Sequence, residues 1–236
     1  MPVGSWENEM DLVDAILSRK SIRAFKPEPV PRRVLEEILE SAIQAPSWGN
    51  TQPWEFFIVN GGKLQELKEG FTNLALEAPR PDVPFVTEFP EPYATRRRNI
   101  GRKVLDLQGI DRKDKERRRR WHVQMTRFFD APHAILISID RSFYHMDDFP
   151  NVWGVFGCGL VAMNITLLAT DHGLGTCLEV APVAYPDVIR QVLEIPDSKL
   201  MVIAIAIGYP DWDAPVNQFR SQREALENIA KWFDFP

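Results

Sequence analysis

Hydrophobic residues along this chain follow two spacings, which predict both helices and strands. Apolar positions recur every three or four residues in four segments, and this predicts amphipathic helices over 10–19, 31–45, 63–76 and 184–193. Short apolar runs bounded by turn residues predict strands at 54–59, 134–139, 176–180 and 201–207. Because helices and strands alternate without internal repeats, we expect a single α/β or α+β domain over residues 1–236.

One further predicted helix, over 152–170, is apolar nearly all round. It contains Gly154, Gly157 and Gly159, which permit close approach of neighbouring elements. We expect this helix to be buried on all sides, at the centre of the domain or at a subunit interface. A turn is predicted at 60–62, and a terminal helix is predicted from Ser221 onward.

Composition limits the function classes. The net charge of −5 does not suggest a protein that binds nucleic acid or an anionic membrane. No apolar signal region opens the chain, and no run approaches the roughly 18 apolar residues of a membrane span, so a cytoplasmic enzyme is expected. Cys158 and Cys177 are predicted to be buried, reduced thiols, and the spacing of the four histidines predicts no metal site.

The region 79–121 combines a loop with a strongly basic helical stretch. Five prolines between 79 and 93 exclude a helix or a central strand there, so we interpret this part as a loop or lid. Between Arg96 and Arg120 stand 12 Lys and Arg residues and 4 Asp and Glu residues. A solvated face and a nucleic-acid surface are both open for this stretch, and the scarcity of interleaved aromatic residues favours the first.

The segment Ser-Arg-Lys-Ser-Ile-Arg-Ala-Phe at 18–25 carries the first candidate chemistry. It holds three cations, Arg19, Lys20 and Arg23, beside the hydroxyl of Ser21. Arginine offers a planar fork of donors that matches phosphate oxygens, so the segment suits a phosphate group. A purely structural role is also open, because cations are favoured at the C-terminus of a helix by its dipole.

The segment Ala-Pro-Ser-Trp-Gly-Asn-Thr-Gln-Pro-Trp at 45–54 carries the second. It is a polar loop bounded by prolines, and it ends in an aromatic residue that opens a predicted strand. An ordinary helix-to-strand connection and a loop that lies against an aromatic ligand both fit this composition.

Together with two later segments, these two resemble the signature segments of the nitroreductase family of flavoenzymes. Gly-Leu-Gly-Thr-Cys-Leu-Glu at 173–179 is similar to the central segment of that family. Ile-Gly-Tyr-Pro at 207–210, followed by two arginines, is similar to its C-terminal strand and phosphate-binding tail. The four segments stand in the order of the family and cover nearly the whole chain.

The resemblance implies an α+β fold, with a mixed β-sheet surrounded by helices, in an interlocked homodimer that binds FMN at the subunit interface. It assigns the phosphate and ribityl chain to Arg19, Ser21, Arg23 and Arg223, with Lys20 nearby and Arg220 assisting. It assigns the ring to a loop of the partner chain, through Pro46, Ser47, Trp48 and Asn50. The opposite face of the ring would be lined by Leu178 and Glu179.

The resemblance also places a polar pair, Gln124 and Arg127, at the pyrimidine edge of the flavin. A fixed cation there would stabilise the negative charge of the reduced ring, whereas a surface cation near a helix end is the structural alternative for Arg127. The region 79–121 stands where family members carry a variable insertion that often covers the substrate. Tyr93 and Arg97 are therefore expected near the substrate.

The activity that the resemblance implies is FMN-dependent reduction of nitroaromatic or quinone-type acceptors by NADH or NADPH. The mechanism would be ping-pong, and the flavin would carry the chemistry without a catalytic side chain. Two alternatives are open: a reductive dehalogenase or desaturase on the same fold, and a non-enzymatic flavin-binding protein.

Overall fold

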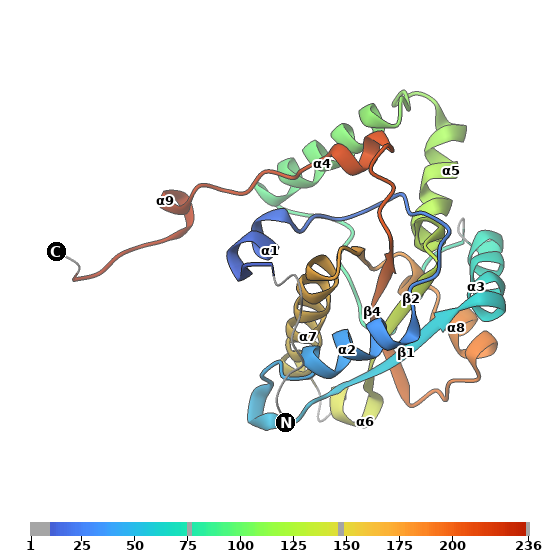
Figure 1. Ribbon diagram of the computed structural model, residues 1–236, viewed down its shortest axis with the longest axis vertical. Helices are drawn as coiled ribbons and strands as arrows, with labels where there is room; N and C mark the ends of the chain where they lie inside the picture. Colours follow the sequence, from blue (N-terminus) through green and yellow to red (C-terminus); the bar gives the residue numbers. More distant parts are fainter. Residues whose placement is uncertain (1–9, 75–76, 146–148, 235–236) are drawn as a thin grey trace.

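The computed structural model describes residues 10–74, 77–145 and 149–234, which form an α+β structure around an antiparallel sheet (Figure 1). Its strands are β1 (Trp54–Asn60), β2 (His133–Asp140), β3 (Gly175–Glu179) and β4 (Lys199–Gly208). Their order is β1-β2-β4-β3, and each neighbouring pair is antiparallel. The expected α+β class is confirmed. A mixed sheet was expected, with both parallel and antiparallel strand pairs. Within the described residues, parallel pairing is limited to one isolated bridge, between Ser21 and Thr176.

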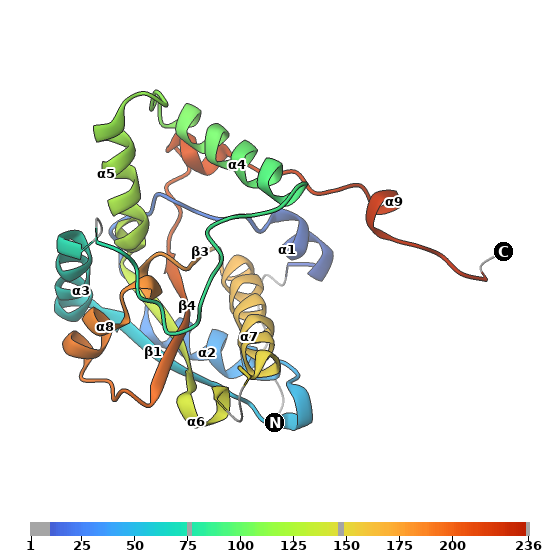
Figure 2. The same ribbon diagram turned by 180° about the vertical axis from the view of Figure 1, so that it is seen from behind.

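Helices cover both faces of the sheet (Figures 1 and 2). One face packs against α3 (Gly61–Leu74) and α8 (Pro186–Leu193), and the other packs against α2 (Arg32–Ala42) and α7 (Val152–Asp171). Alternate residues of β2 belong to the two cores: Leu136 faces α3, whereas Ile135 and Ile137 face α7. Because both faces are covered, His133 through Ile139 are all buried, which explains the continuous apolar run in the sequence.

The remaining elements are short or lie at the periphery of this arrangement. The short α-helices are α1 (Leu12–Ser18) and α6 (Arg141–Tyr144). The 3-10 helices are η1 (Trp48–Asn50), η2 (Phe128–Asp130), η3 (Pro182–Ala184) and η4 (Pro215–Gln218). The turn predicted at 60–62 is wrong, because α3 begins at Gly61 directly after β1.

The expectation that α7 is buried on all sides is wrong within one chain. Its inner face packs on the sheet and on α2, while Trp153 and Phe156 on the outer face are 56% and 57% exposed. By length and hydropathy α7 passes as a membrane-crossing helix, contrary to the expectation that no segment approaches such a span. The same criteria admit the core helix of a soluble protein, and 44% of the most apolar window is buried here.

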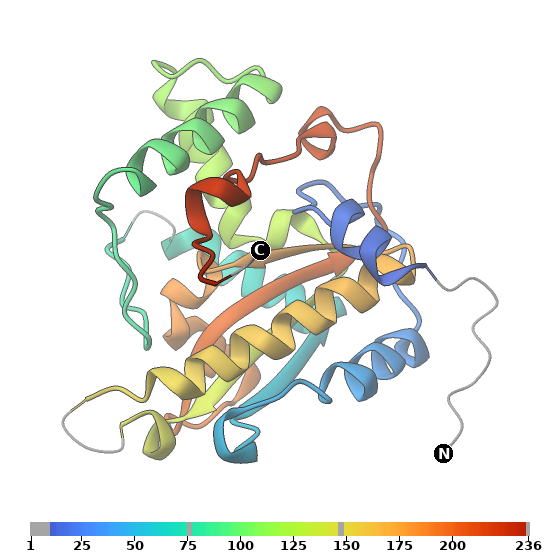
Figure 3. The ribbon, with the colours of Figure 1, turned by 90° about the vertical axis from the view of Figure 1, so that its left-hand side faces the viewer.

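The basic stretch forms two helices, α4 (Tyr93–Leu107) and α5 (Lys115–Thr126), with a break at Gly109, whose φ is +61°. The segment before α4 is tied to the sheet rather than free of it. Asp82 accepts hydrogen bonds from the Met201 amide at 2.8 Å and from the Arg190 guanidinium at 2.6 Å. Figure 3 shows α4 raised above the sheet at one end of the molecule.

The expected terminal helix from Ser221 is wrong, because only α9 (Leu226–Ile229) is helical there. The tail leaves the body of the molecule (Figures 1 and 2), and its apolar side chains find no core. Leu226, Ile229, Trp232 and Phe233 are each more than 60% exposed. A helix of this composition has no packed face to stabilise it within one chain.

The segment 21–26 is joined to the C-terminal part of the chain by Asn217, which is fully buried in η4. Its side-chain oxygen accepts from the Arg23 amide at 2.8 Å, and its side-chain nitrogen donates to the carbonyls of Ala24 and Asp211, both at 2.7 Å. The Ile22 amide donates to the Thr176 carbonyl at 2.9 Å on the other side. The chain after α1 is therefore fixed between β3 and the segment that follows β4.

Replacing Asn217 with alanine removes three hydrogen bonds at a site without access to water. We expect Asn217→Ala to lower the free energy of unfolding by about 2–4 kcal/mol, because buried partners remain unsatisfied. Urea denaturation measures this change. Asn228→Ala is the control, since the Asn228 side chain is exposed and donates to the side chain of Glu224, and this variant should change stability by less than about 0.5 kcal/mol. Equal effects of the two variants would contradict the role of Asn217.

Candidate functional site

Positive side chains from both ends of the chain gather where Asn217 joins them. Arg19 and Lys20 follow α1, whereas Arg220 and Arg223 follow η4. Burial, and then the nearby charges of Arg223 and Arg220, lower the pKa of Arg19 below its usual value. Burial, and then Arg220, lower the pKa of Lys20. The four cations were predicted from two separate segments of the sequence, and in the structure they lie close enough for their charges to interact.

The charge of this cluster is not neutralised by the protein. Within the described ranges, no ion pair joins Arg19, Lys20, Arg23, Arg220 or Arg223 to an acidic side chain. The Lys20 ammonium instead lies 4.9 Å from the centre of the Trp212 ring. The Arg223 guanidinium donates a hydrogen bond to the hydroxyl of Ser221, two residues before it in the chain. Clustered cations repel one another, so a bound anion would relieve this repulsion. Arginine forks and a lysine suit a phosphate group.

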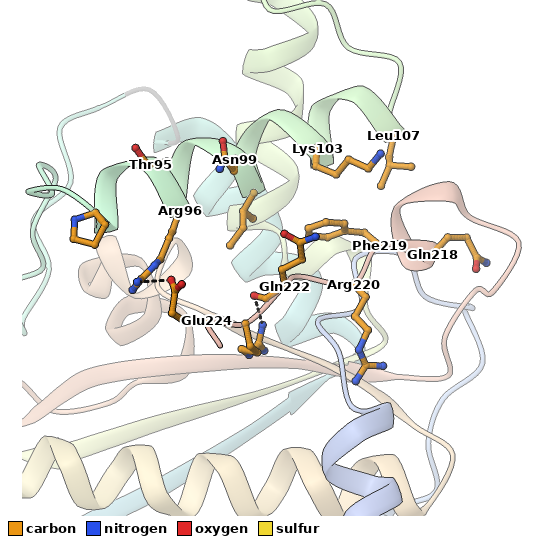
Figure 4. Close-up of a pocket in the computed structure, with 13 residues that line it drawn as sticks. Thr95, Arg96, Asn99, Lys103, Leu107, Gln218, Phe219, Arg220, Gln222 and Glu224 are labelled. Atoms are coloured by element: carbon orange, nitrogen blue, oxygen red, sulfur yellow. Dashed lines mark hydrogen bonds and ion pairs between the residues drawn. The ribbon is translucent and has the colours of Figure 1, made fainter. Parts of the chain in front are cut away.

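A cavity of about 940 Å³ adjoins the cluster, between α4 and the C-terminal tail (Figure 4). Arg220 and Arg223 line one side, and Thr95 and Asn99 of α4 line the other. An ion pair of 2.6 Å between Arg96 and Glu224 joins the two sides, and the figure shows these side chains pointing toward each other. Apolar side chains, among them Ile100 and Phe219, also line the cavity. The space therefore suits a ligand with an anionic group and an apolar part.

β3 presents its two predicted residues in opposite directions, as successive strand residues do. Leu178 is 41% exposed, whereas Glu179 is 6% exposed. Both carboxyl oxygens of Glu179 lack a hydrogen-bond partner among the described residues. Burial raises the pKa of Glu179 well above its usual value, and the charge of Arg23 opposes this only in part. Burial therefore favours the protonated form of Glu179, although the side chain lies close to the cation of Arg23.

The two cysteines are free and buried, as expected. Burial raises the pKa of Cys158 and of Cys177 to about 12, and the nearby Glu179 adds to the shift at Cys177. Neither thiol is a thiolate at neutral pH, so neither is an activated nucleophile. No group of metal-ligating side chains is found within the described ranges.

The loop with Pro46, Ser47, Trp48 and Asn50 lies far from the cations of its own chain. Trp48 is 65% exposed, and a methyl group added at Gly157 of α7 would lie 3.6 Å from Ser47. The cations Arg19, Lys20 and Arg23 instead flank Ser21, which pairs with Thr176 just after α7 ends at Asp171. From Gly157 to Asp171 the helix rises by about 20 Å. Figure 3 shows the two segments toward opposite ends of α7, so they do not share one site within a chain.

Gln124 lies in the last turn of α5 and Arg127 follows its end, on the part of α5 whose Trp121, His122 and Met125 line a cavity together with Arg23. Arg127 donates to Thr72 of α3 at 3.1 Å and pairs with Asp130 at 2.9 Å. The side-chain oxygen of Gln124 (Oε1) is buried and has no hydrogen-bond partner within the described part of the chain. The structure thus ties Arg127 into α3 and η2, and neither residue lines the large cavity of Figure 4.

Tyr93 and Arg97 lie on α4, at the edge of the predicted lid. Tyr93 is 55% exposed and its ring lies under the Arg96 guanidinium, with 5.6 Å from the ring centre to that group. The Arg97 guanidinium lies 5.2 Å from the centre of the Phe89 ring, and Arg97 lines a second cavity, between α4 and α5.

Two features of the structure were not predicted from the sequence: the role of Asn217 and this second cavity. Hydrogen bonding by a residue in a short turn leaves no periodic pattern in the sequence, and neither does the placement of two helices beside each other.

Comparison with known proteins gives a consistent result over the whole chain. The model of the family described as "Nitroreductase family" matches residues 16–209. A nitrobenzene nitroreductase of Ectopseudomonas oleovorans is 34% identical over 92% of this chain and 94% of its own length. A 4-nitrobenzoate reductase of Pseudomonas putida is 30% identical over 95% of this chain and 97% of its own length.

A solved structure shows the same fold. The crystal structure of the FMN and NADPH-dependent nitroreductase NfnB from Sphigopyxis sp. strain HMH superposes with a TM-score of 0.87 and 28% identity. The match covers 96% of this chain and 100% of that chain. The helices α4 and α5 are thus part of an arrangement that a known enzyme shares.

The buried acid of β3 gives a pH-dependent prediction. The pKa of Glu179 is higher in the folded chain than in the unfolded chain, so its contribution to stability is present below about pH 4.5 and is lost as the pH rises toward the folded pKa. Glu179→Gln removes this loss, so the variant gains stability over the original between pH 5 and pH 8, by up to about 1.4 kcal/mol for each pH unit. Urea denaturation at both pH values measures the difference.

The exposed Glu40 on α2 is the matched control for this test. Glu40→Gln should keep the same difference from the original protein at both pH values. If Glu179→Gln behaves in the same way as this control, Glu179 is charged in the folded protein and its pKa is not raised.

Proposed function

Because the chain belongs to the nitroreductase family, we propose that it reduces nitroaromatic or quinone-type acceptors with NADH or NADPH, and with FMN as its cofactor. Bound FMN supplies two-electron transfer between the reduced nicotinamide and the acceptor. Relatives of similar length are named for the reduction of nitrobenzene, chloronitrobenzene and 4-nitrobenzoate. The donor and the acceptor use the same place in turn, which gives a ping-pong mechanism.

The observation that carries this proposal is the cluster of unpaired cations beside a cavity of mixed lining. Arg19, Ser21, Arg23 and Arg223 hold the phosphate and the ribityl chain, and Lys20 and Arg220 add positive charge. The cluster matches the charge of a phosphate monoester, and the cavity offers space for an attached ring system. Leu178 presents its exposed side chain at the ring, while Glu179, whose pKa is raised by burial, points to the opposite side of β3. Gln124 and Arg127 contribute to the pyrimidine edge in this proposal.

A homodimer completes the site in this proposal. Pro46, Ser47, Trp48 and Asn50 contact the flavin held by the partner chain, because they lie about 20 Å along α7 from the cations of their own chain. Large apolar side chains on three elements support this assembly, since each lies exposed in a single chain: Leu17 on α1, Trp153 and Phe156 on α7, and Trp232 and Phe233 on the tail. The tail that leaves the body would pack on the partner.

The region 79–121 acts as the substrate lid in this proposal, within a single domain of 236 residues. Tyr93 and Arg97 on α4 supply an aromatic ring and a cation at its exposed surface. The acceptor is a small aromatic compound, and the enzyme works in the cytoplasm. No protein nucleophile is needed, because the side chains only bind, orient and polarise the reactants.

Anaerobic reduction of the FMN-loaded protein tests the activity. We expect NADH or NADPH to bleach the flavin absorbance near its visible maximum, and nitrobenzene, 4-nitrobenzoate or a quinone to restore it. Parallel initial-rate lines when both reactants are varied would support the ping-pong order. A flavin that neither nicotinamide reduces would indicate a non-enzymatic flavin protein, and faster release of halide from a halophenol than turnover of nitroarenes would indicate a dehalogenase.

The cation cluster gives a separate prediction on cofactor retention. Arg19→Ala and Arg223→Ala each remove a charge-assisted contact to phosphate, so we expect the Kd for FMN to rise by about tenfold or more. Fluorescence titration of FMN and the flavin content after desalting measure the change. Arg33→Ala removes an exposed cation of α2 that pairs with Glu37 and should leave the Kd unaltered. An unchanged Kd in both site variants would reject the phosphate assignment.

A further inference from the structure

A second large cavity, of about 1160 Å³, lies between α4 and α5. Figures 1 and 2 show these two helices at one end of the molecule, where they follow each other in the chain and lie at an angle to one another. Eight cationic side chains line the cavity, and no acidic side chain of the described residues does. Six of the cations come from the two helices: Arg97, Arg98 and Arg102 from α4, and Lys115, Arg118 and Arg119 from α5.

Most of this charge has no counterion in the protein. Arg98 pairs with Glu91 at 2.6 Å, and it is the one lining cation with an ion pair in the described parts of the chain. Two acidic side chains nearby form ion pairs with cations that do not line the cavity: Glu116 pairs with Arg120, and Glu224 pairs with Arg96. A chain with a net charge of −5 therefore carries one cavity, open to solvent, with a strongly positive lining. Such a space attracts a multiply charged anion.

The cavity begins at the proposed cofactor site. Arg23, two residues after Ser21 in the segment assigned to the flavin, lines the cavity together with Arg112 and Lys115. Ile100 of α4 lines both this cavity and the one in Figure 4. A ligand that places one end beside the flavin thus has a positively charged path for its other end.

We propose that this basic cavity binds the phosphate-bearing half of NADPH, and that its cations contact the 2′-phosphate and so favour NADPH over NADH. The inference rests on the proposed function, because it requires a nicotinamide that reaches the flavin. NADPH carries roughly four negative charges, on a diphosphate and a phosphate monoester. Arginine forks bind such groups in pairs, and an arginine commonly accommodates the 2′-phosphate that NADH lacks.

The size and the lining of the cavity distinguish this ligand from smaller anions. A nitroaromatic carboxylate needs one cationic fork, whereas seven lining cations have no ion pair in the described residues, five of them on α4 and α5. Trp121 and His122 add aromatic surface on α5, against which an adenine ring can stack. The cations line a bounded space between helices and the chain is acidic overall, which favours a dinucleotide over a nucleic-acid strand.

A double variant, Arg102→Gln with Arg119→Gln, tests the proposal on the FMN-loaded protein. Neither side chain makes a hydrogen bond or an ion pair within the described residues, so the change leaves the fold intact. We expect the KM for NADPH to rise about tenfold or more and the KM for NADH to change less than about threefold, with kcat preserved. Calorimetric titration with 2′,5′-ADP should show the same loss of affinity without turnover.

The matched control is Lys113→Gln with Arg120→Gln, which removes two charges from the same region outside the cavity. It should leave both KM values and the affinity for 2′,5′-ADP unchanged. An equal loss for NADH and NADPH overturns the 2′-phosphate assignment, and no loss in the Arg102 and Arg119 variant overturns the site itself. A selective rise in the KM for 4-nitrobenzoate, compared with nitrobenzene, overturns it in favour of an acidic acceptor.

The outcome is separable from that of the proposed function. If neither nicotinamide reduces the original protein, the proposed function fails, and the 2′,5′-ADP titration then decides about the cavity alone. Salt-dependent binding of a DNA duplex by the original protein, lost in the double variant, would overturn the dinucleotide in favour of a nucleic acid.

Discussion

The site depends on one buried side chain, Asn217, which holds the segment after α1 against the segment after β4. Two of its three hydrogen bonds reach backbone groups that lie 194 and 193 residues earlier in the chain, at Arg23 and Ala24, and the third reaches Asp211, 6 residues earlier. Without this connection, Arg19 and Arg23 would belong to one loop and Arg220 and Arg223 to another. Because they are held together, like charges accumulate at one place, which is unfavourable unless an anion binds there.

The sequence predicted the parts of this arrangement that have a period or a residue signature. The buried strands appear as apolar runs, α2 appears as a stripe through Leu35 and Ile38, and the arginines appear as phosphate ligands. Asn217 was not predictable, because an asparagine in a short turn looks the same whether it is solvated or buried. The terminal helix was wrongly predicted from 221 onward, because the apolar residues of the tail follow a helical spacing but have no surface of their own chain to pack on.

The length of α7 imposes the second constraint. The loop at 46–50 packs near its beginning and the cations lie beyond its end, so a single chain presents half of a site at each end. The exposed rings of Trp153 and Phe156 lie on the outer face of the same helix. In the proposed dimer, α7 would be covered on one face by its own sheet and on the other by a second chain, which would account for a composition that is apolar nearly all round. Burial on all sides would then describe the proposed assembly rather than the single chain.

The position of α4 connects cofactor and donor. Its two faces line different cavities, with Thr95, Asn99 and Lys103 on one and Arg97 and Arg102 on the other. The helix is joined to the tail by the Arg96–Glu224 pair. It follows a segment that Asp82 anchors to β4 through the Met201 amide. Any displacement of α4 therefore changes both cavities together. Under the two proposals, discrimination between dinucleotides and retention of the flavin would therefore be coupled through a single helix, although different side chains would determine each of them.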